Sequence, residues 1–357
     1  MTPATAPATV PPMPDPAPFH PAKSGARDPR VSIRLVTCAD GMERGARLLL
    51  LRAGPVEAEI AVDRAFDVLA LRHAGREIGW HSPTGLVAPA LLHPEEEAMG
   101  GWLRGFTGLL ATCGLDHAMG PAEADARPYG DPRRAARGLP LHGRVATLPA
   151  TLNGYGIDWG EGPGDKPTLW AEGTVRQAAV FGEHLELRRR VELCGARLSV
   201  ADIVENRGFA PTPHQMLYHV NFGWPLVDEG TRVAVEADGV AWTAHPGDRD
   251  WRRVPAPDPE RPEWVWQHRA PGPSATVAND ALGLSVRLTH DLPHLLQWGC
   301  YRSGLYALGL EPGTHPAPPL REQGDADLLG HGETRTHHVA LEVSDAAPPL
   351  VPPGGGG

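Results

Sequence analysis

Apolar and polar side chains alternate along several segments of this chain, and this alternation constrains the fold more than any other feature. Val56, Ala58, Ile60 and Val62 lie on one side of an extended backbone, with two glutamates between them. The same spacing recurs at residues 185–193, 233–235, 284–288 and 339–343. Half-buried antiparallel strands produce this period of two. The sequence therefore predicts an all-β protein with antiparallel strands.

Glycine and proline punctuate these segments at short intervals. The chain of 357 residues holds 42 glycines and 39 prolines, which suits a turn-rich β fold better than a helical one. The best helix candidate, residues 94–103, is weakened by its glycines. We therefore predict a large antiparallel β-sandwich, a fold that binds ligands on a concave face or at its loop ends.

The two ends of the chain differ in composition from the middle. Residues 1–28 are rich in Pro, Ala and Thr, and residues 346–357 are rich in Pro and Gly, so we expect flexible tails at both ends. The polar stretches at 123–138 and 244–263 have the composition of surface loops. We expect a single domain over residues 29–345.

The charge and the cysteines restrict partners and compartment. A formal net charge of -10 argues against non-specific binding to nucleic acid or anionic lipid. No signal-peptide pattern and no apolar run long enough to span a membrane is present, so we expect a cytoplasmic protein. Cys38, Cys113, Cys194 and Cys300 form no CxxC pair, which predicts reduced thiols and no zinc site.

Three segments place a titratable residue inside an apolar, strand-like run. They are LPLHGR at 139–144, QMLYHVNFGWP at 215–225 and ALGLEPG at 307–313. A lone imidazole or carboxylate in such a setting costs free energy unless it has a partner. Taken singly, each has an ordinary explanation, because strand histidines are often structural and Glu-Pro-Gly often enters a turn.

The order of these segments resembles that of the aldose 1-epimerase (galactose mutarotase) family. That family has an LHGG-like segment, a V-x-N-x-G strand end, a Pro, a His-x-x-Phe-Asn segment and a C-terminal Leu-Glu-Pro/Thr segment. The matching stretches here are residues 141–143, 204–208, 213, 219–222 and 310–312. More narrowly, the chain is similar to a bacterial mutarotase-like branch of that superfamily. Arg144 replaces the second glycine of LHGG, and Gly223 replaces the family's asparagine, so the identity of the sugar stays open.

The resemblance implies a galactose mutarotase-like β-supersandwich and a reaction that needs no metal or organic cofactor. Mutarotation opens a cyclic hemiacetal, which requires an acid at the ring oxygen and a base at the anomeric hydroxyl. By the family's roles, His219 is the acid and Glu311 the base, while His142 hydrogen-bonds sugar hydroxyls. A histidine and a carboxylate with a raised pKa suit reversible proton transfer near neutral pH.

Further residues are candidates for binding a sugar. Arg104 and Arg144 offer forked donors that would clamp an anionic substituent, although a surface ion pair is the commoner role of an arginine. Asp228 would hydrogen-bond sugar hydroxyls, or else form part of an ordinary turn. Arg64 would likewise reach the sugar, or else form an ion pair with Asp67. The remaining candidates lie in the His219 segment: Asn221 and Trp224, whose indole would stack on a sugar face.

Two other functions remain open at this point. The same acid–base pair would serve a lyase or isomerase acting on an acidic or oxidised sugar, since one fold hosts many reactions. A non-catalytic sugar-binding protein is disfavoured, because binding needs no proton-transfer pair. No GxSxG segment supports a serine hydrolase. The expected partner in every case is a small sugar.

Overall fold

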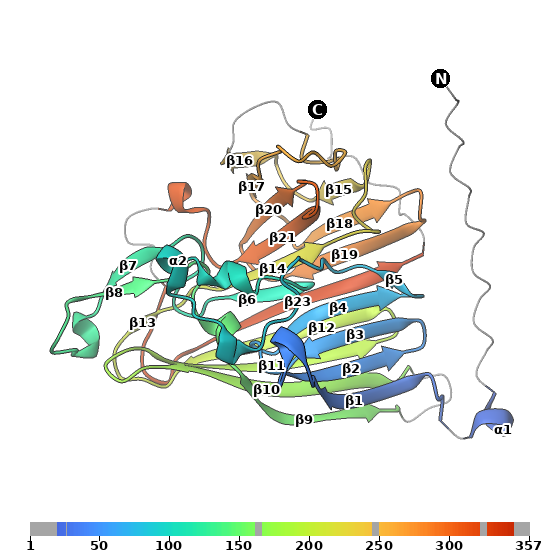
Figure 1. The fold of residues 1–357 in the computed structure, drawn as a ribbon, viewed down its shortest axis with the longest axis horizontal. Helices are drawn as coiled ribbons and strands as arrows, with labels where there is room; N and C mark the ends of the chain where they lie inside the picture. Colours follow the sequence, from blue (N-terminus) through green and yellow to red (C-terminus); the bar gives the residue numbers. More distant parts are fainter. Residues whose placement is uncertain (1–19, 26, 161–165, 245–249, 322–326, 346–357) are drawn as a thin grey trace.

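A computed structural model describes residues 20–25, 27–160, 166–244, 250–321 and 327–345 (Figure 1). Most of the two tails expected from composition lies outside these residues. Within the described part of residues 1–28, Pro21–Ser24 form a single helical turn, α1. The prediction of an all-β protein is confirmed, because long antiparallel strands dominate the described chain.

The larger sheet of the described chain has 11 strands, and every pairing in it is antiparallel. Its spatial order is β1 (Val31–Thr37), β2 (Arg47–Ala53), β3 (Val56–Ala61), β4 (Asp67–His73), β6 (Leu110–Cys113), β14 (Leu217–Phe222), β21 (Ala307–Gly313), β20 (His294–Cys300), β17 (Trp264–His268) and β16 (Val240–Thr243), with β5 (Arg76–Glu77) beside β4. Strands from the two halves of the sequence therefore meet at its centre.

The second sheet within the described residues has eight strands. Its order is β15 (Arg232–Val235), β18 (Ser274–Asn279), β19 (Leu284–His290), β23 (Thr334–Ser344), β12 (Arg197–Asn206), β11 (His184–Cys194), β10 (Thr168–Ala178) and β9 (Ala150–Asp158). Two short ribbons complete the strands: β7 (Ala122–Asp125) with β8 (Ala136–Leu139), and β13 (Thr212–Pro213) with β22 (Leu328–Leu329).

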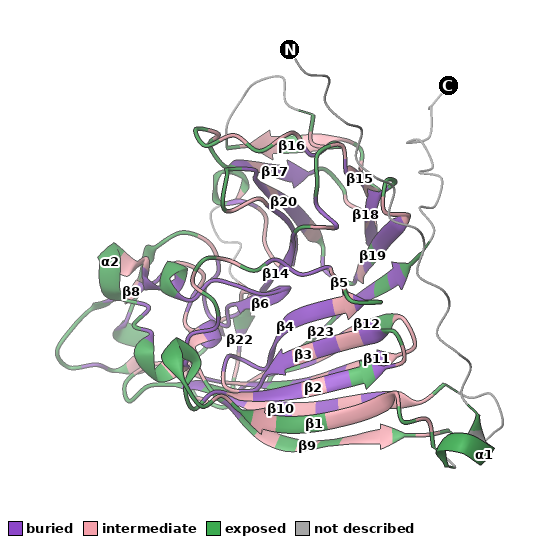
Figure 2. Ribbon diagram, turned by 45° about the vertical axis from the view of Figure 1, so that its right-hand side comes forward, coloured by how far each residue is buried: buried purple, intermediate pink, exposed green. Residues whose placement is uncertain are grey.

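The main hydrophobic core lies between the two large sheets. Leu49, Val68 and Leu310 contribute to it from the larger sheet, and Leu187 and Leu341 from the smaller one. Buried and less buried residues alternate along β10 in Figure 2, as expected for a strand with one face on the core. The predicted pattern at residues 185–193 is confirmed, since alternate side chains of β11 are buried.

Short helical turns occupy the connections. They are α2 (Glu96–Met99) and the 3-10 turns η1 (Gly41–Glu43), η2 (Pro89–Leu91), η3 (Gly101–Arg104), η4 (Arg127–Tyr129), η5 (Val145–Thr147) and η6 (Pro318–Leu320). The helix candidate at 94–103 is thus broken into two turns, with left-handed backbone at Glu97 and Ala98. No helix in the described chain has the length and hydropathy needed to cross a membrane.

Candidate active site

His219 and Glu311 lie opposite each other on neighbouring strands at the centre of the larger sheet. The antiparallel register of β14 and β21 pairs Leu217 with Gly313 and Val220 with Leu310, so His219 faces Glu311. Nε2 of His219 lies 3.1 Å from Oε1 of Glu311, and each side chain is only 5% exposed. Because side chains alternate along a strand, Val220 enters the main core while His219 points to the other face of the sheet.

His142 reaches this pair from the loop between β8 and β9. Its ring centroid lies 5.6 Å from that of His219. The backbone of His142 is left-handed (φ 57°) and is fixed by two hydrogen bonds, from its own N–H to Met119 O and from Gly114 N–H to its carbonyl. A Cβ at Gly143 would lie 2.2 Å from Gly114 O, so only glycine fits after His142.

Aromatic rings surround the two histidines. The ring centroids of Phe106, Trp298 and Trp102 lie 4.8, 5.4 and 6.0 Å from that of His219. Trp80 packs against Phe106 and Trp298. These side chains form a second cluster on the outer face of the larger sheet. Such a wall suits the apolar face of a sugar ring.

Trp102 lies in the 94–103 stretch, and no motif of the sequence pointed to the other three rings of this wall. Trp80 and Phe106 lie 26 residues apart in the connection between β5 and β6, whereas Trp298 lies on β20, and no sequence pattern relates the three. Trp298 has one signal, since it lies opposite Gly309 in the β20–β21 ladder, where a missing side chain leaves room. A glycine between two apolar residues, two positions before Glu311, would have pointed to a close approach there.

Asn221 fastens the other side of the His219 ring. Its Oδ1 lies 2.5 Å from Nδ1 of His219, and its Nδ2 donates to the carbonyls of Gly108 and His219. Asn221 is fully buried. The amide thus holds the imidazole, and the sugar contact expected of Asn221 stays a prediction.

Burial governs the protonation of the pair. It raises the pKa of Glu311 to about 8, and the nearby negative charge of Glu263 acts in the same direction. Burial lowers the pKa of His219 to about 4, although its hydrogen bond to Asn221 opposes this. Burial, with the charges of His219 and His117, holds the pKa of His142 well below its usual value. At neutral pH the pair is therefore a carboxylic acid beside a neutral imidazole.

Two buried polar atoms of the site have no hydrogen-bond partner among the described residues: Oε1 of Glu311 and Nδ1 of His142. The 3.1 Å contact with His219 brings Oε1 close without the alignment of a hydrogen bond. An unsatisfied buried polar group costs about 1–3 kcal/mol. A ligand with hydroxyl groups would satisfy both atoms.

The arginine candidates are engaged elsewhere. Arg64 is buried and donates to the carbonyls of Gly105 and Thr107, which flank Phe106, and it lies 3.5 Å from Asp67. The other two arginines form ion pairs with glutamates of the 93–107 segment. Arg104 pairs with Glu97, and Arg144 pairs with Glu95. Within the described chain, none of the three arginines forms an ion pair with Glu311 or a hydrogen bond with His219.

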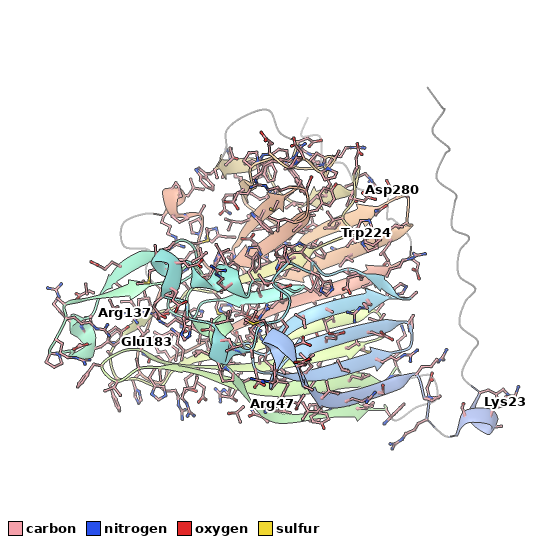
Figure 3. All side chains as sticks on the ribbon, viewed as in Figure 1. Lys23, Arg47, Arg137, Glu183, Trp224 and Asp280 are labelled. Atoms are coloured by element: carbon pink, nitrogen blue, oxygen red, sulfur yellow. The ribbon has the colours of Figure 1, made fainter. Side chains whose placement is uncertain are left out.

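Asp228 and Trp224 lie beyond the strand end that follows His219. Asp228 is exposed and shapes a turn, since its carboxylate accepts from the N–H of Glu229. Trp224 is 70% exposed and appears near Asp280 in Figure 3. Neither belongs to the aromatic wall around His219.

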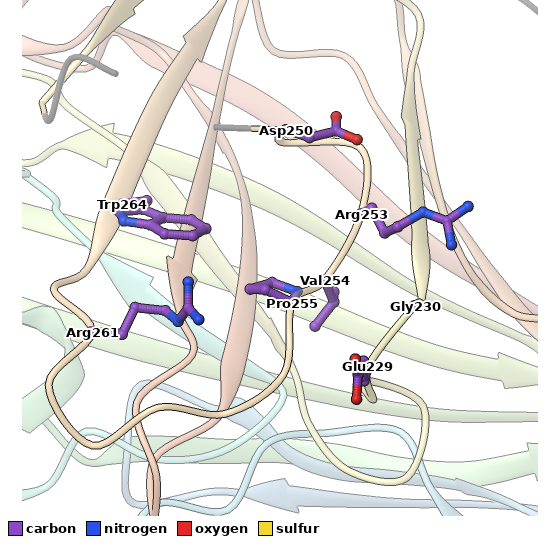
Figure 4. A pocket seen from close by; sticks show the side chains of 8 residues that line it. All are labelled: Glu229, Gly230, Asp250, Arg253, Val254, Pro255, Arg261 and Trp264. Carbon is purple, nitrogen blue, oxygen red and sulfur yellow. The ribbon is translucent and has the colours of Figure 1, made fainter. Parts of the chain in front are cut away.

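A separate hollow of about 480 Å³ opens beside this turn (Figure 4). Glu229, Asp250, Arg253, Arg261 and Trp264 line it, together with Gly230, Val254 and Pro255. Trp264 belongs to the main core, so the hollow lies away from the outer face that carries His219. In the described chain, no group of three or more His, Cys, Asp or Glu side chains is placed to hold a metal ion.

A family model described as a domain of unknown function (DUF4432) matches residues 43–343. Among solved structures, a candidate aldose 1-epimerase from Klebsiella pneumoniae is similar, with 21% identity, a TM-score of 0.77, and coverage of 91% of this chain and 86% of that one. A galactose mutarotase-like protein from Clostridium acetobutylicum is 14% identical, with a TM-score of 0.58 over 89% of this chain and 99% of its own. No curated protein matches the chain. These likenesses confirm the predicted β-supersandwich. The chain belongs to the DUF4432 family and has the galactose mutarotase-like fold.

Proposed function

We propose that this protein is a carbohydrate-active enzyme that interconverts the anomers of a free sugar in the cytoplasm. The observation that carries the proposal is the His219–Glu311 pair, 3.1 Å apart and almost fully buried beside His142. The fold shared with mutarotase-like proteins supports the same reaction class. A binding protein would gain nothing from burying a carboxyl and an imidazole together, because that burial costs free energy.

Ring opening needs one proton to move to the ring oxygen and another to leave the anomeric hydroxyl. In the proposal, His219 and Glu311 exchange these protons with the sugar, and His142 accepts or donates a hydrogen bond to a neighbouring hydroxyl. The surrounding rings exclude water, which strengthens each polar contact. The aldehyde closes again from either face, and both side chains return to their starting protonation.

The resting proton of the pair belongs to Glu311, because burial raises the pKa of Glu311 and lowers that of His219. The roles implied by the family, with His219 as acid, therefore require that the two side chains align into a hydrogen bond and that the proton passes from Glu311 to Nε2 of His219 before ring opening. A sugar hydroxyl donating to Glu311 would favour this transfer, since hydrogen bonds to a carboxylate lower its pKa.

A panel of free sugars tests the proposal. Neutral aldoses, uronic acids and sulfonated sugars would each be mixed with the protein, and anomer exchange would be followed by saturation-transfer NMR. We expect accelerated exchange for at least one neutral aldose, because Arg104 and Arg144 are already paired with carboxylates. An unsaturated product with new ultraviolet absorbance would instead show a lyase, and binding without exchange would show a sugar-binding protein.

A further inference from the structure

We propose that Asn221 is a positioning residue that fixes the tautomer of His219, with the proton on Nδ1 and the reactive position at Nε2. The catalytic use of this tautomer rests on the proposed function, whereas the tautomer itself follows from the hydrogen bonds of Asn221 alone. We therefore assign Asn221 to the imidazole and remove it from the residues that touch the sugar.

The orientation of the Asn221 amide follows from its other contacts. Nδ2 lies 3.1 Å from the carbonyl oxygen of Gly108 and 3.0 Å from that of His219. A carbonyl oxygen only accepts, so the amide nitrogen must face these two atoms. Oδ1 is then the atom that lies 2.5 Å from Nδ1 of His219. Because Oδ1 also only accepts, Nδ1 carries the hydrogen.

The amide has little freedom to turn. The backbone of Asn221 donates to Leu109 O and accepts from Trp80 N–H. Its side chain has no solvent exposure, and both hydrogens of Nδ2 are used. The other tautomer would need the amide flipped so that its NH₂ group donates to Nδ1, and the flip would set Oδ1 against the carbonyl oxygens of Gly108 and His219. The arrangement therefore resists the other tautomer.

With Nδ1 protonated, the neutral imidazole presents the lone pair of Nε2 toward Glu311. That atom lies 3.1 Å from Oε1 of Glu311. Only one proton then remains to be shared between His219 and Glu311, which is what reversible transfer to and from a sugar requires. The other tautomer would point its single N–H toward Glu311 and leave Nε2 without the lone pair that accepts a proton.

Nitrogen-15 NMR of the sugar-free protein tests the tautomer directly. We expect Nδ1 of His219 to be protonated and Nε2 unprotonated at neutral pH, with the signals assigned by their loss in His219→Asn. In Asn221→Leu the proton should redistribute toward Nε2, whereas Asn221→Asp keeps an acceptor oxygen and should keep the parent tautomer. A parent protein with the proton on Nε2 would overturn the inference, even if Asn221→Leu fails to fold.

Kinetics on the best sugar separate positioning from sugar binding. Losing one hydrogen bond that biases the tautomer should lower kcat of Asn221→Leu by roughly 10- to 100-fold, with KM nearly unchanged. A change confined to KM would contradict the inference. Asn206→Leu is the matched control, because Asn206 is also buried, donates to two carbonyls and accepts one N–H; it should leave the His219 tautomer unchanged. If the tautomer is as expected and no sugar is anomerised, the proposed function fails while the role of Asn221 stands.

Discussion

Gly309 shows how closely the strand residues around the His219–Glu311 pair are fitted. It lies on β21 two positions before Glu311, on the same face of the sheet. A Cβ at this position would meet Oε1 of Glu311 at 2.9 Å, Cβ of Trp298 at 3.2 Å and Cε1 of His219 at 3.3 Å. The missing side chain therefore provides the space in which the imidazole, the carboxyl and the indole come together.

Gly309→Ala should therefore displace the carboxyl of Glu311 from His219. We expect the anomerisation rate to fall by about 10²-fold, because misplacement of a reacting group by about 1 Å has an effect of this size. Circular dichroism should still show a folded protein. The control is Gly154→Ala on β9, where the new Cβ meets only Trp170 at ordinary contact distance, 3.4 Å. Equal rates for the two variants would contradict the fitted geometry.

The short ribbon β7–β8 positions the loop that carries His142. Arg137 on β8 is buried and forms ion pairs with Asp116, at 2.8 Å, and with Glu183. Figure 3 shows Arg137 and Glu183 together at one side of the molecule, with Arg137 on the ribbon and Glu183 in the β10–β11 connection. This three-residue ionic cluster anchors β8 just before the LPLHGR segment turns into the site.

Arg137→Gln should lower the free energy of unfolding by about 3–5 kcal/mol, because it leaves the buried carboxylates of Asp116 and Glu183 without their cationic partner. Arg127→Gln on the same ribbon is the matched control. Arg127 is 77% exposed and pairs with Asp125, and such surface pairs contribute about 0–1 kcal/mol. Urea denaturation of both variants checks the prediction. Similar midpoints for the two would show that the buried cluster does not hold the ribbon.

The alternating pattern was enough to predict the strands and the buried side of β11, even with Arg189 among its apolar positions. The sequence could not show that Asp202 and Asp67 pair with this buried arginine, because the partners lie on other strands. For the same reason, the His219–Glu311 contact came from motif order and not from spacing. β14 and β21 are about 90 residues apart, and only the sheet topology makes them neighbours.

The arginines illustrate a different limit of sequence reasoning. Arg104 and Arg144 lie in motif segments, and a role at the substrate stays a prediction for both. Each finds a glutamate of the 93–107 segment in the folded chain. The sequence around an arginine does not show whether its guanidinium group binds a carboxylate of the same protein or an anionic ligand, because both accept the same hydrogen bonds.

Buried histidines make the stability of the whole molecule sensitive to acid. Burial lowers the pKa of seven histidines in the described chain: His117, His142, His214, His219, His268, His290 and His337. The unfolded chain takes up protons near pH 6.5, where these folded imidazoles remain neutral. Stability is therefore lost as the pH falls from about 6.5 toward the lowered values. The raised pKa of Glu311 acts in the opposite sense between pH 8 and its ordinary pKa.

We expect the melting temperature to fall steadily as the pH is lowered from about 7 to 4, with a contribution of about 1.4 kcal/mol for each histidine and each unit of pKa shift. Differential scanning calorimetry across this range measures the effect. His268→Leu should flatten the pH dependence, because burial lowers the pKa of His268 to about 4. A protein more stable at pH 5 than at pH 7 would contradict this account.

The most direct measurement of the central claim is the anomer-exchange rate of Glu311→Gln and His219→Asn, by saturation-transfer NMR on the sugar that the parent protein accelerates most. Glutamine keeps the shape of Glu311 but cannot exchange a proton, and asparagine removes the imidazole. General acid–base groups contribute about 10²–10⁴-fold each, so both variants should lose most of the rate while still binding sugar. The two losses should not add in the double variant, because the groups share one proton. A Glu311→Gln protein that retained a near-parent rate would show that this pair does not carry the reaction.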